Sequence, residues 1–190
     1  MQLPHADVNV FETILARRSV RSYREGALDR RVVQTLLEAA VRAPTAVHEE
    51  PWAFVVVQDQ QILHDLSERG KPLLPEDRWR IAHSSDVLIR PDANLFYDAG
   101  TLIIICASPG SPFVAADCWL AAENLMLAAC ALGLGTCVIG SALPALGEPE
   151  IRAQLGIPDE YVAVAPIIVG QPRGTTPATS RRKPHVLAWH

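Results

Sequence analysis

The basic segment Arg17-Arg18-Ser19-Val20-Arg21 is the first part of the chain whose side chains could bind a ligand. If the segment is extended, alternation places Arg17, Ser19 and Arg21 on one side. Two guanidinium groups and a hydroxyl on one side suit a phosphate, because arginine offers paired donors and a permanent positive charge. The alternative is a solvated basic face that stabilises the end of a preceding helix. Composition alone favours that alternative.

A second basic cluster, Arg181-Arg182-Lys183-Pro184, lies near the other end of the sequence. The whole chain is acidic, with 17 Lys and Arg against 21 Asp and Glu and a formal net charge of −4. Two compact basic clusters in an acidic chain could converge on one anion, although the second cluster alone is typical of a charged surface segment. The net charge and the absence of a basic stripe interleaved with aromatic residues disfavour a nucleic-acid binder.

The segment Ala43–Trp52 (APTAVHEEPW) joins an expected helix to an expected buried strand. Pro44 and Pro51 restrict its backbone, so we expect a rigid loop. A rigid, partly apolar loop with a polar tip could lie along a planar ring. Considered alone, His48 is more often a loop histidine with satisfied hydrogen bonds than a ligand or a base.

Motifs for other ligands are missing from the sequence. Neither GxGxxG after a strand nor GxxxxGK[ST] occurs, which disfavours a Rossmann dinucleotide site and a P-loop. A bound phosphate would therefore depend on arginines. No metal site is expected, because the four cysteines form no CxxC pair and lack zinc-site spacing. These are Cys106, Cys118, Cys130 and Cys137, all in apolar runs where a free cysteine behaves as a small hydrophobe.

The elements that must position these segments follow from capping residues and apolar periodicity. Helices are expected from Asn9 to Arg17, from Asp29 to just before Pro44, and over Gln60–Arg69, Ala115–Leu132 and Pro149–Leu155. Strands are expected over Ala53–Val57, Thr101–Cys106, Gly135–Ile139 and Val162–Val169. Pro166 predicts that the last strand lies at an edge or contains a bulge.

The 190 residues are expected to form a single domain, 1–190, because no linker divides them and 49% are hydrophobic. Residues 71–97 lack periodicity, and a loop of that length is either functional or disordered. Residues 171–190 form a tail without helix or strand period.

One uncharged stretch, Asn124–Gly147, is long enough to span a bilayer. Gly133, Gly135, Gly140 and Pro144 interrupt it, so a buried helix followed by a buried strand explains it better. We therefore expect no membrane association. The first residues lack a basic segment leading into an apolar run, which predicts no signal peptide and a cytoplasmic location.

Four segments together resemble the FMN-dependent nitroreductase family. They are RRSVRSY after a short helix, APTAVHEEPWAFVVV, DCWLAAENLMLAACALGLGTCVIG, and the closing IIVGQP with a terminal RRKP. Each segment is a weak signal alone, but their order and spacing are specific. The resemblance covers roughly residues 9–186.

The resemblance implies an α+β sandwich, with a central mostly antiparallel sheet flanked by helices, that forms an intertwined homodimer. Two FMN sites would lie at the dimer interface, to which the apolar helix Ala115–Leu132 would contribute. The implied activity is NAD(P)H-dependent reduction of a nitroaromatic, quinone or similar small acceptor. A hydride from NADH or NADPH would pass through flavin N5 in ping-pong order. No catalytic acid or nucleophile is predicted, because the cofactor carries the chemistry.

By position, the resemblance assigns two groups of cofactor-binding residues. Around the ribityl phosphate it places Arg17, Arg18, Ser19 and Arg21, with Arg182 and Lys183 closing the site from the tail. Along the isoalloxazine ring it places Pro44, Thr45, Ala46 and His48, contributed by the second subunit, with backbone groups of Ile139 and Gly140 on the other side.

Candidate substrate contacts are Glu50 and three aromatic residues of an expected lid over 71–97, namely Trp79, Phe96 and Tyr97. The aromatic residues could stack on an acceptor, and Arg78 or Arg80 could meet a nicotinamide phosphate. The alternative is that these aromatic residues anchor the loop to the core.

His48 and Glu50 stand where relatives often carry amides. An ionised Glu50 near the ring would lower the flavin potential, whereas protonation or pairing with His48 would leave the field small. A non-catalytic flavin sensor, or a family variant that acts on enones, halogenated compounds or flavins, is the alternative function.

Overall fold

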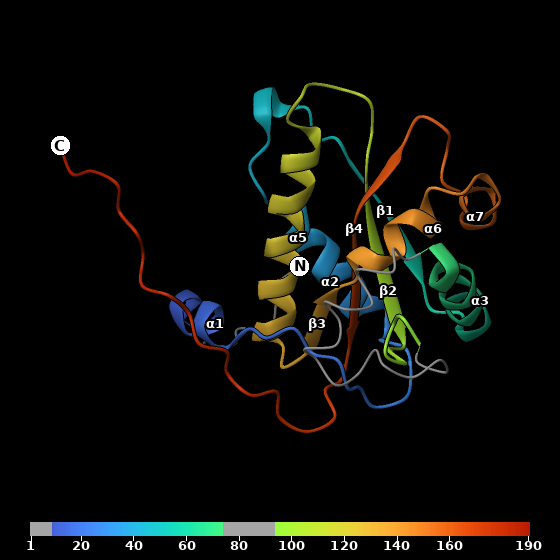
Figure 1. Cartoon of the computed structure of the whole chain (residues 1–190), viewed down its shortest axis with the longest axis horizontal. Coiled ribbons are helices and arrows are strands. Elements are labelled where there is room, and N and C mark those ends of the chain that lie inside the picture. The colour runs from blue at the N-terminus through green and yellow to red at the C-terminus, as the bar shows by residue number, and fades with distance from the viewer. Residues whose placement is uncertain (1–8, 74–93) are drawn as a thin grey trace.

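A four-stranded antiparallel sheet forms the centre of the computed structural model, which describes residues 9–73 and 94–190 (Figure 1). The strands are β1 (Trp52–Val57), β2 (Thr101–Ala107), β3 (Gly135–Val138) and β4 (Val162–Gly170). Their order is β1-β2-β4-β3, so β2 and β4 are central. Every residue of β2 is buried, and the apolar run that follows Thr101 is typical of a strand covered on both faces.

Different helices cover the two faces of the sheet. On one face, α2 (Arg30–Ala40) and α5 (Val114–Ala131) pack on Ile103 and Ile105 of β2. On the other face, α3 (Gln60–Gly70), α6 (Leu143–Leu146) and α7 (Pro149–Leu155) cluster with Leu102 and Ile104. Successive β2 side chains therefore alternate between the two faces of the sheet, as they do along any extended strand. The expected α+β fold with a mostly antiparallel sheet is confirmed.

Helix α5 passes the length and composition test for a membrane span. Its core-facing positions are small or aliphatic, including Cys118, Ala121, Leu125 and Ala129, and all four are completely buried against the sheet and α2. This packing accounts for the apolar composition without a bilayer. On its outer face, Trp119 and Leu120 remain partly exposed.

Capping side chains fix the starts of the first two helices, as predicted. Asn9 Oδ1 accepts a hydrogen bond from Phe11 N at 2.8 Å, and α1 (Val10–Ala16) follows. Asp29 Oδ1 accepts from Arg31 N at 2.7 Å at the start of α2. These bonds satisfy amide groups that the first helical turn leaves without partners.

Pro166 lies in a central strand, so the predicted edge position is wrong, while the predicted irregularity is present. β4 pairs with β2 at Ile104↔Pro166, and the register shifts between Ile105 and Cys106. On the other side, β3 ends at Val138, opposite Ile167, so Pro166 lies just past that ladder. Its carbonyl accepts from Ile139 N at 2.8 Å. The missing amide of proline therefore removes no ladder bond to β3.

The tail follows β4 and leaves the body of the molecule, passing α1 before it extends away (Figure 1). Its first residues are attached through the bridge Tyr23↔Pro172 and a bond from Arg173 N to Ser22 O at 2.9 Å. Residues 173–190 are all exposed and lack regular secondary structure, as the sequence predicts. Leu187 and Trp189 are 91% and 89% exposed, which is unusual for large apolar side chains.

Candidate functional site

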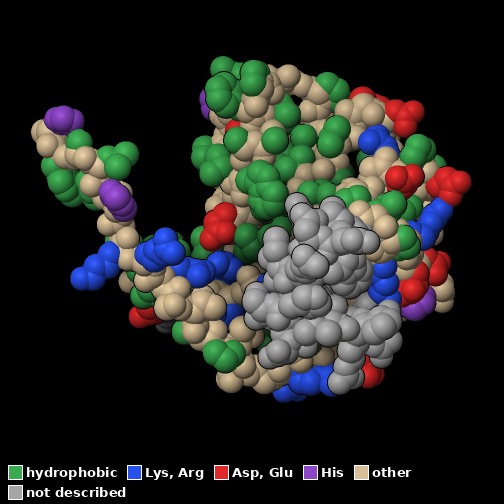
Figure 2. Space-filling view, in the orientation of Figure 1, with side chains coloured by type: hydrophobic (Ala, Val, Ile, Leu, Met, Phe, Trp, Pro, Cys, Tyr) green, Lys and Arg blue, Asp and Glu red, His purple; other side chains and the backbone are tan. Residues whose placement is uncertain are grey.

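A cavity of about 240 Å³ lies between the segment after α1 and the tail. Arg17, Arg18, Ser19 and Arg21 line it from the first segment; Thr176, Pro177, Thr179 and Arg181 line it from the tail. No carboxylate occurs among these described lining residues. Four guanidinium groups and three hydroxyls make a donor set that matches a phosphate in charge and hydrogen-bonding geometry. Figure 2 shows Lys and Arg side chains gathered where the tail leaves the body.

An extended backbone presents the N-terminal half of this cavity. Ser19 forms a parallel bridge with Thr136 of β3, and Val20 N donates to Thr136 O at 2.9 Å. Val20 is buried, whereas Ser19 and Arg21 are exposed, so the predicted alternation is present. Gly135 permits the close approach, because a Cβ there would lie 2.7 Å from Val20 Cγ2.

The arginines of the first segment differ in their own contacts. Arg18 Nη1 donates to carbonyls at the end of α1, including Arg17 O at 2.8 Å, so Arg18 stabilises that helix end as the sequence-based alternative proposed. Arg17 Nε lies 3.7 Å from Glu123 Oε1 of α5. Each guanidinium carries five N–H donors, so both keep donors for a ligand.

Arg21 lies over the ring of Tyr97, with its guanidinium carbon 6.0 Å from the ring centre. Burial is the main influence on the pKa of Tyr97 and raises it, while Arg21 lowers it. Burial likewise raises the pKa of the nearby Cys137 thiol, against the opposing effect of Arg21. Both groups are therefore neutral near pH 7, and neither cancels the positive charge of the cavity.

A second cavity, of about 260 Å³, adjoins the first and shares Arg17, Arg18 and Thr176 with it. The rest of its wall is mostly small or apolar, and includes Cys130 and Leu134. Burial raises the pKa of the Cys130 thiol, although Arg17 and Arg18 oppose the shift. The basic cavity thus continues into a less polar recess near the end of α5.

The loop from Pro44 to Glu50 lies at the other end of α5. Ala46 N donates to the Asp117 carboxylate in the first turn of α5, at 3.2 and 3.3 Å from its two oxygens. Asp117 and Cys130, which lines the recess beside the basic cavity, are separated by about 20 Å along a helix. Figure 1 shows the loop in cyan beside the start of α5 and α1 near its other end. One chain therefore does not bring the predicted ring-contacting loop to the predicted phosphate site.

Ile139 and Gly140 follow β3, which begins beside the basic cavity at Thr136. Three residues of extended chain separate Thr136 from Ile139, a distance of about 10 Å. The Ile139 side chain is buried in the core, so only its backbone could contact a ligand. A Cβ built on Gly140 would meet nothing within 4 Å, so the space beside its backbone is open.

Two of the predicted lid residues lie within the described structure. Phe96 is 1% exposed and packs in the core, so it offers no ring face to an acceptor, and its burial favours the alternative of a core anchor. Tyr97 is half-buried and contacts Arg21 as described above. Trp79, together with Arg78 and Arg80, lies outside the described residues.

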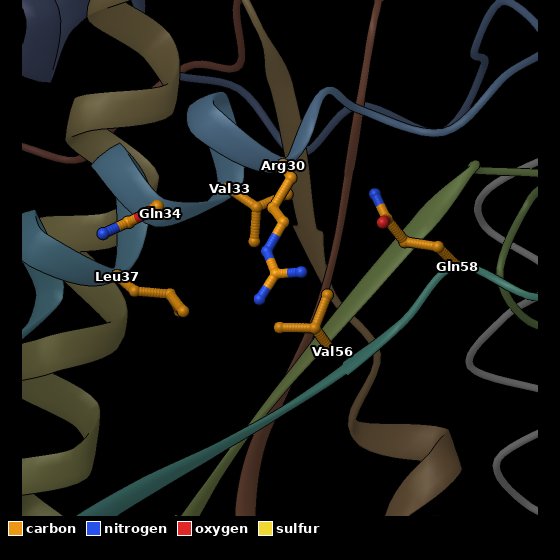
Figure 3. Close-up of a pocket in the computed structure, with 6 residues that line it drawn as sticks. All are labelled: Arg30, Val33, Gln34, Leu37, Val56 and Gln58. Carbon is orange, nitrogen blue, oxygen red and sulfur yellow. The ribbon is translucent and has the colours of Figure 1, made fainter.

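A further cavity, of about 510 Å³, is formed between α2 and β1 (Figure 3). Arg30, Val33 and Leu37 of α2 face Val56 of β1 across it, and Gln34 and Gln58 complete the lining. No residue assigned to a site from the sequence lines this cavity. It borders β1, one of the two edge strands of the sheet.

The sequence profile of the nitroreductase family matches residues 14–171. The chain belongs to the nitroreductase family. The match covers the basic segment, the 44–50 loop, α5 and the whole sheet, and it confirms the resemblance seen in the sequence.

Relatives within the nitroreductase family match nearly the whole chain. A crystal structure of a nitroreductase with bound FMN from Bacteroides fragilis is 30% identical, with a TM-score of 0.80, over 95% of this chain and 98% of that chain. A protein of Methanothermobacter thermautotrophicus, provisionally named an NADH dehydrogenase/NAD(P)H nitroreductase, is 29% identical over 96% of this chain and 88% of its own length. An FMN reductase (NADPH) of Bacillus subtilis is 27% identical over 86% of this chain and 66% of its own length.

In this member of the nitroreductase family, the tail residue on the basic cavity is Arg181, whereas the resemblance assigned Arg182 and Lys183. Neither of those two is among the described residues that line the cavity, and both are exposed. Sequence reasoning also missed Thr176, Thr179 and Asp117. The run of basic residues in the tail could have indicated Arg181. The single acidic residue at the start of an apolar helix could have indicated Asp117.

Proposed function

We propose that this chain is an FMN-dependent NAD(P)H oxidoreductase that reduces a nitroaromatic, quinone or similar small acceptor by ping-pong kinetics. The observation that carries the proposal is the convergence of Arg17, Arg21 and Arg181 on one cavity without a described carboxylate, in a chain of the nitroreductase family. The FMN-bound relative from Bacteroides fragilis and the NADPH-dependent relative from Bacillus subtilis support the cofactor and the electron donor.

The residues present fit FMN at its phosphate end. Arg17, Ser19, Arg21 and Arg181 supply charge and donors for the phosphate, and Arg18 adds charge while it stabilises α1. The open backbone at Gly140 lies in the direction that β3 takes from this cavity. When bound, FMN supplies a ring that accepts a hydride and passes it on. The chain's own residues bind, orient and shield; none is needed as an acid or nucleophile.

A homodimer completes the proposed site. The basic cavity and the 44–50 loop lie near opposite ends of α5, so the loop beside one phosphate site would come from the second subunit. Exposed apolar side chains occur on α1, on the outer face of α5 and in the tail. They include Phe11, Leu15, Trp119, Leu120, Leu187 and Trp189. Figure 2 shows hydrophobic side chains gathered over α5. A surface this apolar is typical of an interface between subunits.

The edge of the sheet offers a second region for the partner. Strand β1 lies at the edge of the sheet, and such an edge tends to pair with another chain unless it is covered. The cavity beside it has apolar walls from Val33, Leu37 and Val56 (Figure 3). The location that we propose for this dimer is the cytoplasm, in keeping with four free cysteines.

Steady-state kinetics with a panel of acceptors tests the proposed activity. NADH and NADPH are each combined with a nitroaromatic, a quinone and an enone, and both substrate concentrations are varied. Parallel double-reciprocal lines with at least one acceptor are expected, because donor and acceptor occupy one face of the flavin in turn. A protein that binds FMN but oxidises neither donor with any acceptor would instead be a flavin sensor.

Replacing Glu50 by glutamine is expected to raise the flavin midpoint potential by roughly 20 mV, the size of one partly screened charge. Glu50 is exposed in the loop proposed to lie along the ring, and no ion pair with His48 occurs in the described structure. Its negative charge would therefore oppose electron uptake by the flavin. Equilibration with reference dyes measures the potential. Glu160→Gln, at an exposed position before β4, is the control, and equal potentials for Glu50→Gln and the parent would contradict the prediction.

A further inference from the structure

The loop between α2 and β1 is held in a strained backbone conformation. Val47, His48 and Glu50 have φ values of 48°, 57° and 47°, in the left-handed region. This region is unfavourable for residues with a side chain, and most unfavourable for a β-branched residue such as Val47. Val47 is 82% exposed, so its own burial does not offset the strain. Such conformations persist only where surrounding contacts impose them, and they cluster at functional sites.

Two carboxylates fix this loop to the start of α5 and to the segment just before it. Asp117 is 4% exposed, and its two oxygens lie 3.2 and 3.3 Å from Ala46 N. Glu49 Oε2 lies 3.2 Å from Ser111 N, just before α5. Glu49 N also donates to Ala46 O at 3.1 Å, which closes the turn. Val47 and His48 therefore lie between attachments at Ala46 and Glu49, and Glu50 directly follows the second attachment.

Asp117 is an unusual residue for a purely structural role. Burying a carboxylate is unfavourable unless strong hydrogen bonds compensate. In the described part of the chain, the Asp117 carboxylate accepts from a single backbone amide, for which a neutral side chain would suffice. The charge strengthens that bond, and the start of α5 stabilises the charge. The result is a contact of both carboxylate oxygens with the residue where the strained turn begins.

We propose that Asp117 is a positioning residue for the acceptor. Through Ala46 it holds the 44–50 loop in its strained form, so that the loop presents a fixed wall to a planar acceptor on the flavin of the partner subunit. This inference rests on the proposed function, which places the loop along the ring. Asp117 itself touches neither cofactor nor acceptor.

Two substitutions at position 117 test the role. Asp117→Leu removes both hydrogen-bond-accepting oxygens and keeps the branched shape of the side chain, while Asp117→Asn keeps one accepting oxygen and the size. The leucine variant is expected to raise the KM of a nitroaromatic or quinone at least tenfold. Its preference for FMN over riboflavin, which lacks the phosphate, should change less than threefold, because the phosphate cavity lies elsewhere. The asparagine variant should restore the KM to within about threefold of the parent.

Hydrogen exchange provides a readout that does not depend on flavin chemistry. In FMN-free protein, Asp117→Leu is expected to speed exchange of the Ala46 amide at least tenfold relative to the parent. This result separates the two proposals: if the parent fails to bind FMN, the proposed function fails while the exchange result still tests Asp117. Unchanged exchange in the leucine variant, or an asparagine variant as impaired as leucine, would overturn the inference.

Thr101→Val is the matched control. Thr101 is fully buried, and its Oγ1 accepts a hydrogen bond from Leu28 N at 3.1 Å. Like Asp117, Thr101 therefore bonds a buried side-chain oxygen to the backbone amide of a loop. This variant is expected to lower the melting temperature and leave the acceptor KM unchanged. If Thr101→Val also raised the KM of the nitroaromatic or quinone tenfold, the loss of any buried polar side chain would have the same effect. That result would overturn the specific role of Asp117.

Discussion

Replacing Arg17 and Arg181 together by alanine is expected to lower the affinity for FMN by at least a hundredfold. The two residues approach the basic cavity from opposite ends of the sequence, after α1 and within the tail. A charge-assisted hydrogen bond to a phosphate contributes about 1.5–3 kcal/mol, so each arginine accounts for about tenfold or more in affinity. Quenching of flavin fluorescence during titration measures the dissociation constant.

Riboflavin provides the control ligand, because it has the ring of FMN without the phosphate. The parent should bind FMN much more tightly than riboflavin, and the double variant should lose most of that preference. Arg31→Ala, at an exposed arginine in α2 outside the cavity, should leave both affinities unchanged. A double variant that keeps the full preference for FMN would show that the phosphate binds elsewhere.

The tail assignment can be resolved by comparing two single variants. The structure places Arg181 on the cavity, while the family resemblance assigned Arg182. Arg181→Ala should therefore weaken FMN binding more than Arg182→Ala. The opposite order would favour the assignment by resemblance.

Replacing Trp119 by aspartate is expected to convert the proposed dimer into monomers at micromolar concentration. Trp119 lies on the outer face of α5, 42% exposed in one chain, beside the partly exposed Leu120. Loss of a tryptophan anchor costs about 2–4 kcal/mol, and an unpaired carboxylate in an apolar interface costs more. The dissociation constant should rise at least a hundredfold, as measured by sedimentation equilibrium.

Flavin binding should change with the oligomeric state in this variant. If the 44–50 loop of the partner borders the ring, the monomer should bind FMN more weakly even though its arginines are intact. Val162→Asp, at another exposed apolar residue at the start of β4, is the matched control and should remain dimeric. A monomeric parent, or a Trp119→Asp variant that stays dimeric, would contradict the shared site.

Local patterns predicted the elements of this fold well. The caps at Asn9 and Asp29 and the apolar runs of β1 and β2 are signals that act within a few residues, and the structure confirms these elements. The predicted full burial of β1 is wrong, because β1 lies at an edge of the sheet and Val56 is 38% exposed. Strand order depends on pairing between distant segments. Pro166 therefore suggested an edge strand, although the end of β3 at Val138 lets a proline lie inside the sheet.

The residues of the candidate site could be predicted from the sequence where their backbone is regular. Alternation from Ser19 to Arg21 followed from an extended segment, and the bridge to Thr136 confirms it. In the tail, a displacement of one residue changes which basic side chain faces the cavity, so Arg181 and Arg182 could not be distinguished from sequence. Nothing in the sequence indicated positive φ at Val47, because β-branched residues rarely adopt it. That strain depends on a contact with Asp117, which is 71 positions away in sequence.

Anaerobic mixing of the FMN-loaded protein with NADH or NADPH tests the proposed activity most directly. The flavin absorbance should bleach with about one equivalent of donor per flavin, and a nitroaromatic or a quinone should then restore it, as expected of a two-electron carrier between two substrates. A protein that stays colourless after FMN is added would contradict the flavin site. A yellow protein that neither NADH nor NADPH bleaches would contradict the oxidoreductase and leave a flavin-binding sensor.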